Sequence, residues 1–252
     1  MKSKLSSKTI WITRALSKED DLQHYLSLKG LKVINYPLIE LTKNEEQSVF
    51  QAIDSINEYD WLIIPSPNAA GYLYDSIKKS KAVSLDNITT KISCLGIKTR
   101  EKASALGLIV DHISMKANIQ DLLKTIPVKK GNRIIYFTSD RVNQNFITDS
   151  LKDRNCSLKR VELYKNKPNL LDSKQIESIN ISSPELIAVY SYSAIDALCL
   201  NANQIKSNIY NTPIVCVGPR TADYAISKQF NKVTYSSSAK DKDMLNACLD
   251  RL

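Results

Sequence analysis

The sequence is poor in the residues that build metal sites and disulfide frameworks. Its 252 residues include only two histidines, His24 and His112, and five cysteines that are widely spaced, with no Cys-x-x-Cys pair. An odd, dispersed set of cysteines indicates neither a disulfide framework nor a zinc site, and two isolated histidines do not favour a histidine-based catalytic triad. We therefore expect no metal, and buried or idle thiols in a reducing compartment. The cysteines are Cys94, Cys156, Cys199, Cys216 and Cys248.

Long apolar runs are also missing. No run approaches the roughly 18 apolar residues that a membrane-spanning helix needs. The first residues, M-K-S-K-L-S-S-K, are basic but lack the apolar stretch of a secretory signal peptide. From these features we predict a cytoplasmic protein that acts without a membrane.

Positive charge exceeds negative charge, and the formal net charge is +9. Three interpretations compete: an ordinary lysine-rich surface, attraction of a polyanionic small molecule, or nucleic-acid binding. Nucleic acid would favour clustered basic residues with aromatic side chains between them, whereas the lysines here are dispersed. The expectation is therefore no nucleic-acid partner.

Short apolar runs alternate with amphipathic stretches along the whole chain, a pattern typical of parallel sheets covered by helices on both faces. The fold class predicted is α/β. We expect strands at residues 9–14, 61–65, 91–95, 109–113, 131–138, 186–190, 214–217 and 233–235, and extended segments at 31–41 and 158–165. We expect helices at residues 18–29, 45–57, 119–126, 143–153, 173–179 and 240–252, a helix after residue 95 that ends at Ala105, and helices that begin near Asn68, Ala194 and Pro219.

The two halves of the chain repeat one another. Four features recur in the same order at separations of 122–127 residues. Thr13 corresponds to Thr138, Leu31 to Leu158, Ser66 to Ser191 and Gly96 to Gly218. The chain therefore contains two copies of one α/β unit.

Glycine- and hydroxyl-rich turns follow several of the predicted strands, where open α/β sheets place ligands. In the Gly-x-x-Thr turns, glycine allows a ligand close to the backbone, and the helix that follows offers free N–H groups. Each turn taken alone is better explained as an ordinary helix cap. Together, these neutral donors suit several carboxylates better than one phosphate. The turn residues are Ser66, Asn68, Gly96, Thr99, Ser139, Asp140, Ser191, Tyr192, Ser193, Gly218, Pro219 and Thr221.

Nucleotide-binding glycine motifs and paired catalytic carboxylates are not found in the sequence. Neither G-x-x-x-x-G-K-[ST] nor G-x-G-x-x-G occurs. The acidic residues are scattered over predicted helical faces. The turns therefore favour binding and orienting a substrate over strong proton chemistry.

The ordered motifs resemble the uroporphyrinogen-III synthase family over nearly the whole chain. The residues that carry the resemblance are I-T-R, G-L-K-V, W-L-I-I-P-S-P-N-A, C-L-G-I-K-T, F-T-S-D, V-E-L-Y-K-N, V-Y-S-Y-S-A and V-C-V-G-P-R-T-A. The resemblance implies two similar parallel-sheet α/β domains joined by a two-stranded β-ladder, with a cleft between them. The domains would be residues 1–36 with 168–252, and residues 37–167, with linker strands near 36–41 and 163–168, so that each sequence repeat is split between domains.

The resemblance also implies the reaction. The linear tetrapyrrole hydroxymethylbilane, with eight carboxylates, would lose water and close to uroporphyrinogen III with inversion of ring D, in heme biosynthesis and without a cofactor. The protein would favour this closure over the unassisted one, which gives the symmetric isomer, by orienting the substrate. A monomer is expected. The alternative is a non-catalytic two-domain protein that binds a small polycarboxylate.

The resemblance assigns roles to individual residues. Tyr164 matches the family's tyrosine at the cleft, where its phenol could donate a proton to the departing hydroxyl. Thr99 and Thr221 match threonines at helix starts, and the serines of the turns match positions that bind substrate side chains. Arg14 is a candidate carboxylate partner, although the family often has proline where Ala15 follows. Asn68 replaces a residue that is sometimes arginine.

Overall fold

The computed structural model describes residues 8–16, 21–116, 118–140, 147, 149–151, 153–238 and 240–252. The chain divides into two compact units, one of Met1–Glu40 with Lys167–Leu252 and one of Leu41–Asn166. Each unit contains its own sheet. No helix among the described residues is long and apolar enough to cross a membrane.

The first unit is built on a parallel sheet of five strands in the order β11-β10-β9-β1-β2. Its strands are β1 (Thr9–Ile12), β2 (Lys32–Asn35), β9 (Leu186–Val189), β10 (Ile214–Cys216) and β11 (Val233–Tyr235). Its helices are α1 (Asp21–Leu28), α7 (Ser173–Ser182), α8 (Tyr192–Asn201), α9 (Pro219–Ser227) and α10 (Asp241–Arg251), with 3-10 turns at Ala202–Gln204 and Ile209–Asn211.

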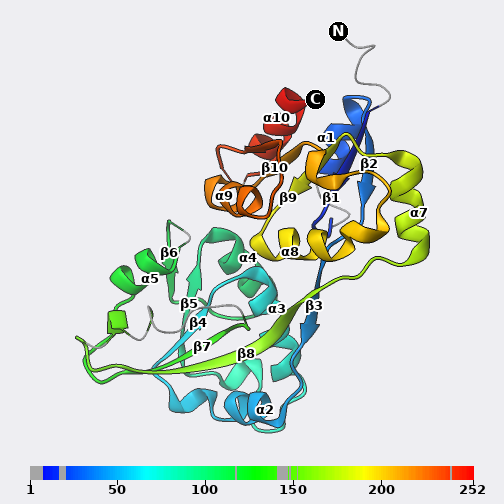
Figure 1. The fold of residues 1–252 in the computed structure, drawn as a ribbon. Helices are drawn as coiled ribbons and strands as arrows, with labels where there is room; N and C mark the ends of the chain where they lie inside the picture. The colour runs from blue at the N-terminus through cyan, green and yellow to red at the C-terminus, as the bar shows by residue number, and fades with distance from the viewer. Residues whose placement is uncertain are drawn as a thin grey trace. The chain divides into compact units, whose positions relative to one another are not determined.

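Both faces of this sheet are covered, as Figure 1 shows for the helices around β1, β9 and β10. Successive residues of a strand point to opposite faces, so Trp11 packs in one apolar core and Ile10 in the other. The Trp11 core includes residues of α7, α8 and α9, and the Ile10 core includes residues of α1 and α10. This two-sided burial explains why the strands are continuously apolar.

The second unit is built on six strands in the order β3-β8-β7-β4-β5-β6. They are β3 (Ile39–Lys43), β4 (Trp61–Ile64), β5 (Lys91–Leu95), β6 (His112–Ser114), β7 (Arg133–Ser139) and the long β8 (Ser157–Pro168), drawn in green in Figure 1. The helices are α2 (Gln47–Asp54), α3 (Pro67–Ile77), α4 (Ile97–Ala105) and α5 (Ile119–Thr125), with 3-10 turns at Ile56–Glu58 and Leu85–Asn87.

Two apolar cores again flank the sheet. One joins α2, α3 and α4 to the inward residues of β4, β5, β7 and β8, and it contains Leu62 and Phe137. The other joins α5, Ile147 and Leu151 to the opposite faces of β4 and β7. The strands β4, β5, β6, β7 and β8 pair in parallel, which brings their carboxyl ends to one edge of the sheet.

The two sheets share one strand order once β3 is set aside. The order β6-β5-β4-β7-β8 corresponds to β11-β10-β9-β1-β2. In the sequence, however, β1 and β2 belong to the same repeat as β4, β5 and β6. Each unit is therefore assembled from the opening strands of one repeat and the closing strands of the other.

Several predicted boundaries are wrong by a few residues. The strand expected at residues 109–113 lies at His112–Ser114, because residues 108–111 connect it to α4. The helix expected from Ala194 begins at Tyr192, because Ser191 caps it. Strand β7 continues through Ser139. Most of the helix expected at residues 143–153 lies outside the described residues.

Candidate functional site

Serines cap the helices that follow β4 and β9, one of the two roles expected for the serine turns in the sequence. The Ser66 Oγ accepts a hydrogen bond from the Ala69 N–H at 3.1 Å and caps α3. The Ser191 Oγ accepts one from the Ala194 N–H at 3.2 Å and caps α8. Both serines therefore have a structural role, which does not use the proton of either hydroxyl.

Tyr164 lies near the end of β8 in the second unit, where its ring is buried. The Tyr164 hydroxyl lies 3.3 Å from the Ser66 Oγ. The ring stacks on the Tyr72 ring of α3, with centroids 5.0 Å apart and an interplanar angle of 24°. Tyr72 in turn donates a hydrogen bond from its hydroxyl to the Leu41 carbonyl at 3.1 Å. Side chains from β8, from α3 and from the turn before α3 thus form one cluster.

The Ser139-Asp140 turn orders the backbone beside Tyr164. The Asp140 N–H donates to the Tyr164 carbonyl at 3.2 Å. The Asp140 Oδ1 accepts hydrogen bonds from the backbone N–H of Asn166 at 3.1 Å and from its amide nitrogen at 3.0 Å. Ser139 is the last residue of β7 and is buried. These hydrogen bonds therefore hold β8 to the turn at Tyr164 and at Asn166, on either side of Lys165.

The Gly96 turn, which follows β5, has a backbone that favours glycine. Gly96 has φ 83°, in the left-handed region. Thr99 is 2% exposed, and its hydroxyl donates to the Leu95 carbonyl at 2.8 Å. That hydroxyl proton is therefore not available as a donor to a ligand.

The corresponding turn after β10 differs both in the backbone conformation of its glycine and in the bonding of its threonine hydroxyl. Gly218 has φ 180°, an extended conformation open to any residue, and a Cβ added there would meet nothing within 4 Å. Pro219 opens α9 without an N–H group. Among the described residues, the Thr221 hydroxyl has no hydrogen-bond partner. The free space and the free hydroxyl both suit a ligand.

Arg14 and Tyr192 lie in the first unit and contact other side chains there. The Arg14 guanidinium pairs with the Asp241 carboxylate at 3.0 Å and lies 4.9 Å from the centroid of the Tyr190 ring. Burial raises the pKa of Tyr190 above its usual value. Tyr192 is 43% exposed, and its ring lies 4.9 Å from that of Tyr224. Ser193 follows it in the first turn of α8.

Asn68 lies exposed in the first turn of α3 and lines a shallow hollow of about 220 Å³ with Tyr72, Asp75 and Lys102. The hollow borders the Tyr72 ring that supports Tyr164. One cation and one carboxylate face it, so its charge favours neither sign of ligand.

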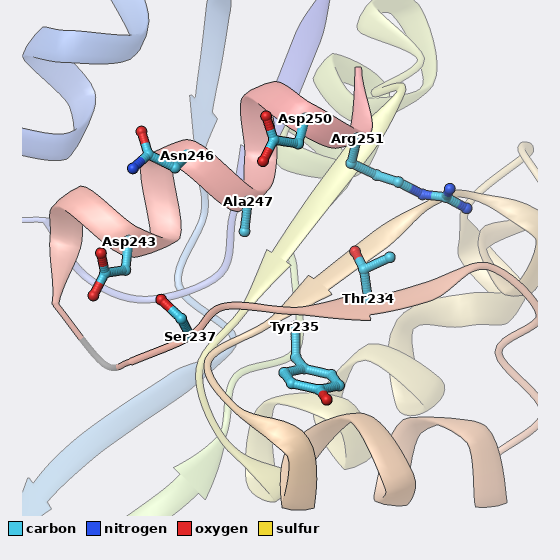
Figure 2. A pocket seen from close by; sticks show the side chains of 8 residues that line it. All are labelled: Thr234, Tyr235, Ser237, Asp243, Asn246, Ala247, Asp250 and Arg251. Atoms are coloured by element: carbon cyan, nitrogen blue, oxygen red, sulfur yellow. The ribbon is translucent and has the colours of Figure 1, made fainter.

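A hollow of about 380 Å³ between β11 and α10 is separate from the predicted site residues (Figure 2). Asp243 and Asp250 of α10 project beside it, with Arg251 at its far end. The Asp243 carboxylate also accepts a hydrogen bond from Ser238. Two carboxylates against one cation disfavour a polycarboxylate ligand here.

The sequence missed Tyr72 and Asn166 as neighbours of Tyr164. Tyr72 stands among apolar residues of an amphipathic helix, and Asn166 is one of several polar residues at the end of a strand. Neither carries a local signal. Among the described residues, no group of three or more histidine, cysteine or acidic side chains is arranged to hold a metal ion.

Comparisons with known proteins agree with one another. The family model described as "Uroporphyrinogen-III synthase HemD" matches residues 20–246. The "Porphyrin biosynthesis protein HemD" of Ruminiclostridium josui is 24% identical over an alignment of 255 residues, which covers all of this chain but 49% of that protein. The chain thus spans about half the length of this curated relative. The "Uroporphyrinogen-III synthase" of Synechococcus elongatus is 24% identical over 86% of this chain and 85% of its own.

Two solved structures share the fold. The uroporphyrinogen-III synthetase of Helicobacter pylori is 15% identical, with a TM-score of 0.66, and the match covers 96% of this chain and 98% of that one. A mutant uroporphyrinogen III synthase of Thermus thermophilus is 16% identical, with a TM-score of 0.60, and the match covers 97% and 98%. At these identities the likeness establishes the α/β fold alone.

Proposed function

The chain belongs to the uroporphyrinogen-III synthase family, and from this premise we propose that it closes hydroxymethylbilane to uroporphyrinogen III. The reaction removes one water and inverts ring D. The net charge of +9 suits a substrate with eight carboxylates, because opposite charge raises the rate of encounter.

The helix starts supply the donors for those carboxylates in this proposal. The first N–H groups of α4, and those that follow Pro219 in α9, have no intrahelical partner, and they carry partial positive charge. Gly218 leaves open space beside such groups, and Thr221 adds a hydroxyl. The backbone N–H groups that follow Ser66 and Ser191 bind in the same manner, while Arg14 contributes positive charge although it already pairs with Asp241.

Tyr164 acts as the general acid. Its phenol protonates the hydroxyl of hydroxymethylbilane. The C–O bond then breaks, water departs, and the substrate becomes an azafulvene cation. Attack on this cation gives a spiro-pyrrolenine, and rearrangement leads to the isomer with ring D inverted. The protein directs the closure by holding the chain in one shape. The observation that carries the assignment is the Tyr164 hydroxyl, fixed 3.3 Å from the Ser66 Oγ.

The test is the isomer ratio. Purified protein mixed with freshly made hydroxymethylbilane should yield uroporphyrinogen III in excess over isomer I, and a sample without protein should yield isomer I. A polycarboxylate-binding protein without activity would leave the ratio unchanged. Isomer I alone in the presence of folded protein would refute the enzyme assignment.

Tyr164→Phe tests the acid. The variant should lower kcat by about 10- to 100-fold, at or below the low end of general-acid effects, because a phenol is a weak acid. Tyr136→Phe is the matched control, since Tyr136 is buried on the opposite face of the same sheet. Cytoplasmic location, a monomeric state and the absence of nucleic-acid binding stay predictions.

A further inference from the structure

We propose that Ser66 and Tyr72 are positioning residues for Tyr164: Tyr72 holds the phenol ring, and the Ser66 hydroxyl stabilises the phenolate once its proton has left. This inference rests on the proposed function. It changes the role of Ser66 from a group that binds substrate to one that acts through Tyr164, and it gives Tyr72 a role that the sequence did not suggest.

A bulge in β8 turns Tyr164 toward α3. Strand β7 pairs with β8 in regular register up to Thr138 and Glu162, but Ser139 then pairs with Tyr164, so that Leu163 is an extra residue. In a regular strand, neighbouring side chains point to opposite faces. Leu163 and Tyr164 instead both lie in the core beneath α3, since a bulge re-aims the residue that follows it.

The Asp140 carboxylate fixes the far side of the bulge. It accepts two hydrogen bonds from Asn166, while the Asp140 N–H binds the Tyr164 carbonyl. The backbone of Tyr164 is therefore restrained by β7 before the residue and by the turn after it. The remaining freedom is rotation of the side chain.

Tyr72 removes that freedom. Its ring stacks on the Tyr164 ring at 5.0 Å, an arrangement typical of offset aromatic pairs. Tyr72 is itself anchored at both ends, by α3 and by the hydrogen bond from its hydroxyl to the Leu41 carbonyl. A ring held in this way keeps the phenol hydroxyl over the Ser66 turn.

Ser66 contacts the reacting oxygen of Tyr164. Its Oγ already accepts the capping bond from the Ala69 N–H, so its own O–H can donate to the Tyr164 oxygen, 3.3 Å away. When the Tyr164 O–H bond breaks and the proton leaves with the departing hydroxyl as water, the Ser66 O–H stabilises the phenolate. The proton released on ring closure then returns to the phenolate, which balances the cycle.

The experiment is a double-mutant cycle. Tyr72→Leu, Tyr72→Phe and Ser66→Ala are made both in the wild-type chain and in the Tyr164→Phe chain, and kcat, KM and the isomer ratio are measured. Tyr72→Leu and Ser66→Ala should each lower kcat about tenfold in the wild-type chain, but less than about twofold in the Tyr164→Phe chain. KM should change little. Tyr72→Phe should retain most of kcat, because the ring stack remains.

Ser191→Ala is the matched control for Ser66→Ala, since it removes an equivalent capping bond from a helix of the other unit. Each should lower the free energy of unfolding by about 1 kcal/mol. The effect of Ser191→Ala on kcat should be the same in both Tyr164 backgrounds.

The outcomes are distinct. Equal losses of kcat in the two backgrounds would mean that Ser66 and Tyr72 act only on the fold, which overturns the inference. An unchanged kcat in Tyr72→Leu, in Ser66→Ala or in Tyr164→Phe, with isomer III still formed, would also overturn the inference. The proposed function would then stand. If the wild-type protein gives only isomer I, the proposed function fails and the inference fails with it.

Discussion

Gly96 and Gly218 begin equivalent helices, yet the chain needs glycine at only one of them. At Gly96 the φ of 83° would strain any residue with a Cβ. At Gly218 the backbone is extended, and the space that a Cβ would fill is empty. A glycine that the fold does not require is consistent with close approach of a ligand.

The two alanine variants should therefore behave differently. Gly96→Ala should lower the free energy of unfolding by about 1–2 kcal/mol because of its left-handed backbone. Gly218→Ala should leave it unchanged or raise it slightly, because alanine reduces the entropy of the unfolded chain, but should raise KM severalfold. Thermal unfolding and steady-state kinetics measure both. An unchanged KM in Gly218→Ala would argue against substrate contact at this turn.

Three of the five thiols should be inert in the folded protein. Burial raises the pKa of Cys94, Cys216 and Cys248 to about 12 in each case, so at about pH 8 they are neutral thiols, and the thiolate is the reactive form. A thiol reagent at that pH should modify at most Cys156 and Cys199 in the native protein, and all five after unfolding. Native Cys94→Ser should take up as much reagent as the native wild type; a lower count in this variant would contradict the prediction.

At the scale of the element, the starts of α4 and α9 use their threonine hydroxyls differently. The Thr99 hydroxyl closes back on its own strand through the Leu95 carbonyl. The Thr221 hydroxyl makes no such bond within the described part of the chain. The repeat in the sequence predicts the same role for both threonines, whereas only the Thr99 hydroxyl makes a hydrogen bond among the described residues.

Valine substitutions separate these roles, since valine keeps the shape and removes the hydroxyl. Thr99→Val should lower the free energy of unfolding by about 1–2 kcal/mol, because it removes a buried hydrogen bond. Thr221→Val should lower the free energy of unfolding by less than about 0.5 kcal/mol, because it removes no hydrogen bond made by the described residues, and it should raise KM. Chemical denaturation and kinetics of the two variants provide the comparison. If Thr221→Val lowered the free energy of unfolding more than Thr99→Val, and Thr99→Val raised KM, the assigned roles would be wrong.

At the scale of the whole molecule, the units do not coincide with the sequence repeats. Leu41–Asn166 forms one continuous unit, with a complete strand order and both of its apolar cores. The first sequence repeat, by contrast, holds strands of two different sheets. Folding depends on which strands pair, rather than on which segments resemble each other.

Two fragments of similar length test this difference. Residues 41–166 alone should unfold cooperatively in denaturant, because they retain both cores. Residues 1–125, which hold one sequence repeat, should show no cooperative transition, because β4 loses its partner β7 and β1 loses its partner β9. Circular dichroism across a urea titration measures both. Cooperative unfolding of residues 1–125 would contradict the strand pairing described above.

The sequence by itself determined the α/β class, the order of most strands and helices, the internal repeat and the serine and glycine turns, because these follow from local periodicity and capping chemistry. Only the tertiary structure decided that a bulge beside Thr138 points Tyr164 at Ser66, that Tyr72 supports it, and that the Thr99 hydroxyl is already used. Most of those features depend on contacts between residues far apart in the chain, such as Ser66 and Tyr164. Strand register and ring packing are set by such distant partners, and no local pattern encodes them.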